Sequence, residues 1–226
     1  MKFFIIIFAF IFSSNALADF AHINPSDKVD VIFIVDDSAS MTPFQQKLSS
    51  NLDALLEDFR NSDAHFGILT TSATRGAFAF PYTPGVFLGT GTSGSFDQVV
   101  GALKKDILVG TDGNAEEKPF DVALMALSEP YISNENKGFL RPNIPLILVI
   151  ITDEPDQSSV TAKQFADQLV VLKGDSSLSL YGYIPKDNTC GQNGPHTNIP
   201  EAAGYLGGKT YNLCDDDWSK NKIHFH

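Results

Sequence analysis

The sequence predicts an α/β fold, an open and doubly wound sheet that is mostly parallel and carries helices on both faces. Two apolar runs, 29–35 and 146–152, are rich in β-branched residues, which is typical of strands buried on both faces of a parallel sheet. Between and after them, leucine and phenylalanine recur at helical spacing. Because strands alternate with helices along the chain, we expect right-handed β-α-β units.

The other elements follow from the same patterns, read in chain order. Apolar spacing predicts a helix over 44–59, and a strand is expected at 64–71 with a shorter edge strand at 76–80. The Gly-, Thr- and Ser-rich stretch 85–94 is expected to be a loop. Further helices are expected at 96–103, 119–127 (with Pro119 at its start), 161–172 and 200–206, and further strands at 177–184 and 208–213.

The first eighteen residues have the pattern of a secretory signal peptide. Lys2 precedes the apolar run 3–12, and Ala16-Leu17-Ala18 forms a small-x-small end. The apolar run is shorter than the roughly 20 residues that span a bilayer. We therefore expect residues 19–226 to form one domain that is secreted, whether periplasmic, cell-surface or extracellular.

Composition excludes several classes of partner. The chain has 16 Lys and Arg against 27 Asp and Glu, a formal net charge of −11, and its pI is near 4.7. Nucleic-acid binding needs clustered basic residues, so a nucleic-acid partner is not expected. Docking on an anionic membrane is disfavoured for the same reason.

Cys190 and Cys214 are the two cysteines of the chain. In an oxidising compartment, an isolated pair is expected to form a disulfide. The loop that it closes, about 25 residues long, would contribute about 3 kcal/mol to stability. Free thiols or metal ligands are the weaker alternative, because neither cysteine has a CxxC or histidine partner at zinc spacing.

Polar residues gather just beyond the two strongest strands, where ligands bind in such sheets. Asp36, Ser38 and Ser40 follow the first strand, and Asp153 follows the second. Thr111 lies between them in the Gly-rich connection V-G-T-D-G. Carboxylate and hydroxyl oxygens are the ligands that hard dications such as Mg²⁺ and Ca²⁺ prefer. Since only two of these groups are charged, a cation held here would stay electrophilic and could recruit an anionic oxygen from a partner.

These segments resemble the von Willebrand factor type A family. The run 29–41 resembles the family's first strand and the start of its metal-ion-dependent adhesion site, and 147–156 resembles the strand and loop that carry its distal aspartate. The resemblance implies a Rossmann-like fold and a site made by the five residues Asp36, Ser38, Ser40, Thr111 and Asp153. It implies Mg²⁺ as the ion, with Mn²⁺ or Ca²⁺ as alternatives. Thr90 and Thr92 are alternatives to Thr111. Segments 138–141 and 153–158 and the late cysteine pair are most similar to bacterial secreted members.

Two positions depart from the family pattern, and several residues have simpler roles open to them. Ala39 stands where glycine is often found, and Glu154 stands where many adhesive members have glycine. Glu154 would either repel an acidic ligand or turn into solvent. Ser40 could instead cap the following helix. Asp37 is expected to be solvated.

The sequence favours a binding function over catalysis. It contains no G-x-S-x-G elbow, P-loop or G-x-G-x-x-G after the first strand. Phosphatases with an aspartyl nucleophile need a second Asp two positions on, where Ser38 stands. We therefore expect a secreted or cell-surface adhesion domain, not an enzyme, that captures an acidic group of a protein or glycan. An envelope assembly module braced by its cation is the alternative, with a phosphohydrolase less favoured.

Overall fold

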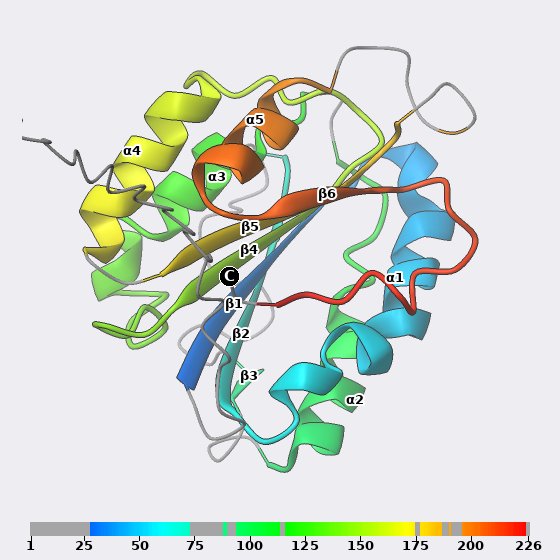
Figure 1. The fold of residues 1–226 in the computed structure, drawn as a ribbon, viewed down its shortest axis with the longest axis horizontal. Coiled ribbons are helices and arrows are strands. Elements are labelled where there is room, and N and C mark those ends of the chain that lie inside the picture. Colours follow the sequence, from blue (N-terminus) through cyan, green and yellow to red (C-terminus); the bar gives the residue numbers. More distant parts are fainter. Residues whose placement is uncertain are drawn as a thin grey trace, which may run out of the picture.

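The computed structural model describes residues 28–72, 88–89, 94–113, 116–174, 177–186, 190 and 196–224. Its centre is a six-stranded sheet in the order β3-β2-β1-β4-β5-β6 (Figure 1). All neighbouring strands are parallel except β2 and β3. The strands are β1 (Lys28–Val35), β2 (Asp63–Thr70), β3 (Leu88–Gly89), β4 (Leu146–Ile151), β5 (Leu178–Ile184) and β6 (Lys209–Asn212). The α/β fold with a mostly parallel sheet is thus confirmed.

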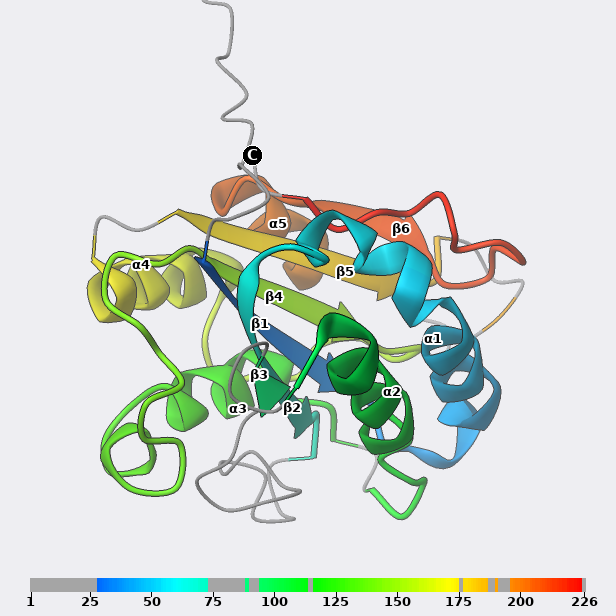
Figure 2. The same cartoon turned by 90° about the horizontal axis from the view of Figure 1, so that it is seen from below.

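Helices cover both faces of the sheet (Figure 2). α1 (Thr42–Leu55) and α2 (Phe96–Asp106) share one apolar core with the sheet, and α3 (Pro119–Ala126), α4 (Ala162–Lys173) and α5 (Asn198–Tyr205) share the other. Short 3-10 helices lie at Ala39–Met41, Glu57–Phe59 and Tyr131–Ser133. None of the helices in the described ranges has both the length and the apolar character needed to cross a bilayer.

The side chains of β1 explain why residues 31–35 form an unbroken apolar run. Phe33 and Val35 belong to the core beneath α1 and α2, whereas Ile32 and Ile34 belong to the core beneath α3, α4 and α5. All four are fully buried. Alternate residues of a strand point to opposite faces, so a strand covered on both sides has no position for a solvated side chain.

Strand register aligns the carboxyl ends of the central strands. Val35 at the end of β1 pairs with Thr70 of β2 on one side and with Ile151 of β4 on the other. Ile151 in turn pairs with Tyr183 of β5. The segments that follow these strands therefore emerge side by side at one edge of the sheet, which is where the candidate site lies.

Most predicted elements are found within a few residues of their expected bounds, and one segment differs. Leu88 and Gly89, expected to be in a loop, pair with β2 as the antiparallel strand β3. Two residues carry no recognisable alternation, so a strand this short has no sequence signature. The edge strand expected at 76–80 and the signal peptide expected at 1–18 lie outside the described residues.

The carboxyl-terminal segment is held against the sheet by a disulfide and by aromatic packing. Cys190 and Cys214 form the expected disulfide, with their Cα atoms 5.6 Å apart. Trp218 is fully buried and its ring centroid lies 4.6 Å from that of Tyr183 on β5. The Tyr183 hydroxyl donates a hydrogen bond to the carbonyl of Asn221 at 2.7 Å.

Removing the disulfide should destabilise the chain without unfolding it. In a Cys190→Ser/Cys214→Ser double variant, the free energy of unfolding is expected to fall by about 3 kcal/mol, because the unfolded chain regains the entropy of a closed loop. Urea denaturation of the variant and of the oxidised wild type measures this difference. Equal midpoints in the two proteins would show that the bridge adds nothing to stability.

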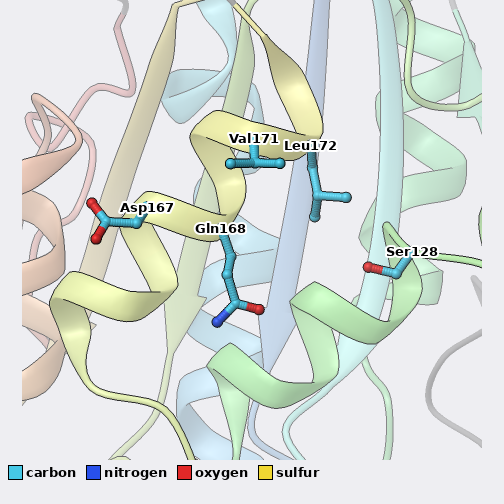
Figure 3. A pocket seen from close by; sticks show the side chains of 5 residues that line it. All are labelled: Ser128, Asp167, Gln168, Val171 and Leu172. Atoms are coloured by element: carbon cyan, nitrogen blue, oxygen red, sulfur yellow. The ribbon is translucent and has the colours of Figure 1, made fainter.

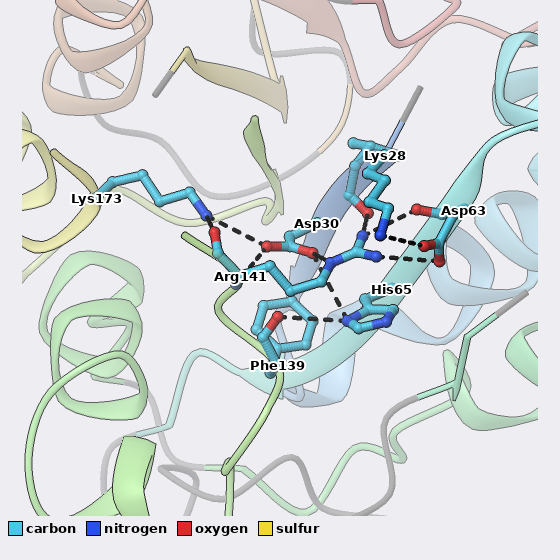
Figure 4. Close-up of polar contacts among 8 residues, drawn as sticks. Lys28, Asp30, Asp63, His65, Phe139, Arg141 and Lys173 are labelled. Carbon is cyan, nitrogen blue, oxygen red and sulfur yellow. Dashed lines mark hydrogen bonds and ion pairs between the residues drawn. The ribbon is translucent and has the colours of Figure 1, made fainter. Parts of the chain in front are cut away.

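A charged network lies at the amino end of β1, away from the candidate site (Figure 4). Asp30 is fully buried and accepts a hydrogen bond from Arg141 Nε at 2.7 Å, while Lys173 Nζ of α4 lies 3.3 Å from its other oxygen. Arg141 also donates through Nη2 to the carbonyls of Val29 at 2.7 Å and Asp63 at 2.9 Å. One guanidinium thus joins β1, β2 and the segment before β4.

Candidate metal centre

Asp36 is held in one orientation at the end of β1. Its backbone N–H donates to the carbonyl of Ile151 at 2.9 Å, which extends the pairing with β4 by one residue. Its carboxylate accepts a hydrogen bond from the Ser38 backbone N–H at 2.7 Å and another from the Thr152 hydroxyl at 2.6 Å. Asp36 is fully buried, so these two donors fix the direction in which its remaining lone pairs face.

Ser38, Ser40 and Asp153 form a chain of hydrogen bonds beside Asp36. The hydroxyl oxygens of Ser38 and Ser40 lie 3.1 Å apart, and the Ser40 hydroxyl donates to Asp153 Oδ1 at 3.1 Å. α1 begins at Thr42 without a side-chain cap, so Ser40 does not serve as a helix cap. The structure therefore brings together four of the five residues singled out in the sequence.

Thr111, the fifth, lies in a loop that docks on the same strand end but is not joined to the other four. Gln45 Nε2 donates to the carbonyls of Asp36 at 2.9 Å and Gly110 at 2.8 Å, which ties α1, β1 and this loop together. The Gly113 N–H donates to the carbonyl of Asp37 at 2.7 Å. In the part of the chain that the structure describes, no hydrogen bond links the half-exposed Thr111 hydroxyl to the four residues. Thr90 and Thr92 lie outside that part.

Asp37 is fully buried, so the expectation that it is solvated is wrong. Its carboxylate accepts a hydrogen bond from the Ser72 hydroxyl at 2.7 Å. The backbone of Gly113 packs so closely that a Cβ there would lie 2.4 Å from an Asp37 carboxylate oxygen. The loops that follow β2 and α2 cover Asp37. These loops are distant from Asp37 in sequence, so its local sequence does not predict its burial.

In the folded chain, ionisation of the carboxylates of the site is unfavourable. Burial raises the pKa of Asp36, and the neighbouring charge of Asp153 raises it further. Burial also raises the pKa of Asp153. Glu154 is half-buried, and its pKa is raised by burial and by the charges of Asp36 and Asp153, so its own charge adds to the repulsion at the site. A dication would offset this repulsion.

Glu117, two residues before α3, was not singled out by its sequence context. It is fully buried, and burial together with the charge of Asp36 raises its pKa to about 8. The charges of Glu154 and Asp37 act in the same direction. Glu117 thus lies in the field of three other acidic residues at this edge of the sheet.

In the presence of chelator, stability is expected to fall as the pH rises from about 4.5 to about 8. The pKa of Glu117 rises from 4.5 to about 8 on folding, so between these values the folded chain retains a proton that the unfolded chain has lost. The stabilisation is complete below pH 4.5 and is lost above pH 8. The raised pKa values of Asp36 and Asp153 act in the same direction.

Urea denaturation in EDTA across this pH range, on wild type and Glu117→Gln, measures the effect. The variant should show a flatter dependence, because it lacks the titrating group. Comparing the two proteins cancels the opposite contribution of His65, whose pKa is lowered by burial. If the stability of the two proteins depended on pH in the same way, the raised pKa of Glu117 would be contradicted.

The donor set suits a hard dication. In the described ranges, no group of three or more His, Cys, Asp and Glu side chains has the spacing of a metal cluster. A site here would rest on hydroxyl oxygens and two carboxylates, which favours Mg²⁺ over softer ions.

A hollow of about 280 Å³ lies away from these residues, on α4 and the turn after α3 (Figure 3). It is lined by Ser128, Asp167, Gln168, Val171 and Leu172.

Comparison with protein families gives one match, to the von Willebrand factor type A domain over residues 30–181. The matched stretch is more than half of the chain, and it contains all five residues expected to hold a metal. The comparison with curated proteins returns no match.

Among solved structures, the chain is similar to proximal thread matrix protein 1 from the mussel byssus. One crystal form has 16% identity and a TM-score of 0.53, and covers 83% of this chain and 44% of that one. A second structure, described as having a zinc-occupied metal-ion-dependent adhesion site motif, has 17% identity, a TM-score of 0.52 and the same coverage. This chain thus spans less than half the length of those chains, and the likeness establishes the fold.

Proposed function

The chain belongs to the von Willebrand factor type A family, and on this premise we propose that it is a metal-dependent binding domain. A divalent cation at the carboxyl ends of β1 and β4 captures an acidic group of a protein or glycan partner. The observation that carries the proposal is the convergence of Asp36, Ser38, Ser40 and Asp153 from two neighbouring strand ends.

These four side chains would hold the ion, and the family resemblance adds Thr111. The chain's own oxygens supply two negative charges against the two positive charges of the ion. A bound cation would supply a Lewis-acidic position at which a carboxylate oxygen of a partner binds. Mg²⁺ is the proposed ion, with Mn²⁺ and Ca²⁺ as alternatives, because the donors are hard oxygens.

The residue two positions after Asp36 supports binding over hydrolysis. A phosphohydrolase with an aspartyl nucleophile needs a second Asp there, and Ser38 stands in that position. We also propose that the domain acts outside the cytoplasm. The signal-like residues 1–18 and the Cys190–Cys214 disulfide support this location.

A second function, in which the cation only braces the loops, is favoured by one observation. Glu154 lies close enough to Asp36 and Asp153 for their charges to raise its pKa. A carboxylate at this position would repel an acidic ligand that approached the ion. Under this reading the chain is an assembly module and its cation has no open position.

Partner capture and thermal unfolding in the same buffers separate the two functions. The mature chain, residues 19–226, would be immobilised and exposed to secreted proteins of its source in Mg²⁺, with and without EDTA. Ligand capture expects that EDTA releases a partner, that amidating the partner's carboxylates prevents its binding, and that the chain stays folded. Bracing expects a lower melting temperature in EDTA and no metal-dependent partner.

Two variants complete this experiment. Asp153→Asn replaces a proposed ligand by a neutral group of the same shape and should lose the partner. Asp167→Asn removes an exposed carboxylate of α4 that pairs with Lys163 and should behave as wild type. A partner that both variants bind equally, or that EDTA leaves bound, would contradict metal-dependent capture.

A further inference from the structure

We propose that Glu117 is a third anionic group of this cation site and acts on the ion through water. The inference rests on the proposed function, because it presumes a cation beside Asp36. It gives Glu117 the part in holding the ion that the family resemblance gives to Thr111.

The backbone of Glu117 lies across the end of β1. Glu117 forms an antiparallel bridge with Ser72. The backbone N–H of the following residue, Lys118, donates to the carbonyl of Thr71 at 3.0 Å. On its other side, the Glu117 carbonyl accepts a hydrogen bond from the Gln157 N–H at 2.7 Å. Ser72 and Thr71 follow β2, and Gln157 follows β4. Since β1 lies between those two strands, this segment spans the point where Asp36 emerges.

The side chain of Glu117 is fully buried without a partner. Among the described residues, neither of its carboxylate oxygens makes a hydrogen bond of good geometry. The Thr71 hydroxyl makes none either, although it lies close enough to oppose the rise in the pKa of Glu117. The neighbouring Lys118 does not neutralise it, because Lys118 Nζ pairs with Glu116 at 2.8 Å on the surface. A buried carboxylate normally has a hydrogen bond, an ion pair or a metal, since burial without one is costly.

The charges around Glu117 indicate that this carboxylate needs a positively charged partner. Asp36, Glu154 and Asp37 all repel its charged form, and together with burial they raise its pKa. A protonated Glu117 would need an acceptor for its O–H, and among the described residues neither of its oxygens makes a hydrogen bond of good geometry. A hydrated dication beside Asp36 would satisfy both needs, because it supplies positive charge and water O–H donors.

The route through water follows from the spacing of the carboxylates. Asp36, Asp153 and Glu117 are not grouped at the spacing of direct ligands. Carboxylates that support a metal from behind its ligands commonly change its affinity by about 10–100-fold. The buried oxygens of Glu117 and Thr71 make no hydrogen bond of good geometry among the described residues, and they are the kind of polar group that an ordered water would bridge to the ion.

Isothermal titration of the mature chain with MgCl₂ and with MnCl₂ tests the assignment. Glu117→Gln, which keeps the shape and removes the charge, is expected to weaken binding by about 10–100-fold. Glu116→Gln is the matched control, because its side chain lies one residue away on the surface. It should change affinity less than twofold.

Two further variants keep every outcome decisive. Glu117→Asp retains the charge, so affinity kept in this variant but lost in Glu117→Gln supports the proposal. Equal loss in both, or loss in neither, overturns it. Circular dichroism and melting in EDTA establish that each variant is folded. If Asp36→Asn abolishes binding and Glu117→Gln does not, the cation site stands and this inference fails. If wild type binds neither ion, both fail.

Discussion

Asp36→Ala is expected to abolish measurable binding of Mg²⁺ and Mn²⁺ in isothermal titration. Asp36 is the carboxylate that two donors hold in place, and it belongs to the loop that also carries Ser38 and Ser40. Removing it takes away half of the site's proposed ligand charge. The loss should therefore exceed the roughly 10–100-fold that is typical of residues which only support a ligand.

A second variant separates loss of the ligand from damage to the fold. Alanine leaves the Thr152 hydroxyl and the Ser38 N–H without their acceptor, which costs about 1–3 kcal/mol for each buried group. Asp36→Asn keeps an acceptor for one of them and should lose metal binding with a smaller loss of stability. Asp167→Asn, remote on α4, should titrate as wild type. Wild-type affinity in either Asp36 variant would remove the basis of the metal site.

Arg141→Met is expected to cause the largest loss of stability, about 3–5 kcal/mol of unfolding free energy. Asp30 is fully buried, and this guanidinium binds it while also satisfying two backbone carbonyls. Without Arg141, Lys173 Nζ at 3.3 Å and His65 Nδ1 at 3.7 Å remain beside the Asp30 carboxylate. Denaturation by urea measures the change in free energy.

Arg60→Met is the matched control for this substitution. Arg60 binds Glu57 at 2.9 Å and Asp97 at 2.7 Å, but its side chain is 39% exposed. Exposed ion pairs contribute about 0–1 kcal/mol, so this variant should unfold near the wild-type midpoint. Mg²⁺ affinity should be unchanged in both, since Asp30 lies at the opposite end of β1 from Asp36. Equal destabilisation by the two substitutions would contradict the importance of the buried network.

The sequence was sufficient to predict most of the sheet and the convergence of four polar residues at its edge, for a simple physical reason. The runs 31–35 and 146–151 are apolar at every position because β1 and β4 are covered on both faces. Once two strands are parallel and adjacent, the residues after them emerge together. Asp36 and Asp153 could therefore be placed near each other although 117 positions separate them.

The residues that escaped prediction depend on contacts between loops. Glu117 stands two positions before Pro119 at the start of α3, a context in which an acidic residue is commonly explained by the helix dipole. Its burial arises from backbone bonds to Thr71 and Gln157, distant in sequence. Gln45 could have been noticed, because it lies one turn before Leu48 on the buried face of α1, where a polar side chain is unexpected.

The most direct test of the metal site is a crystal structure of residues 19–226 grown with MnCl₂, measured at a wavelength where manganese scatters anomalously. We expect one anomalous peak between the side-chain oxygens of Asp36, Ser38, Ser40 and Asp153. A peak at another place on the chain, or ordered side chains in this position with no peak among them, would contradict the account.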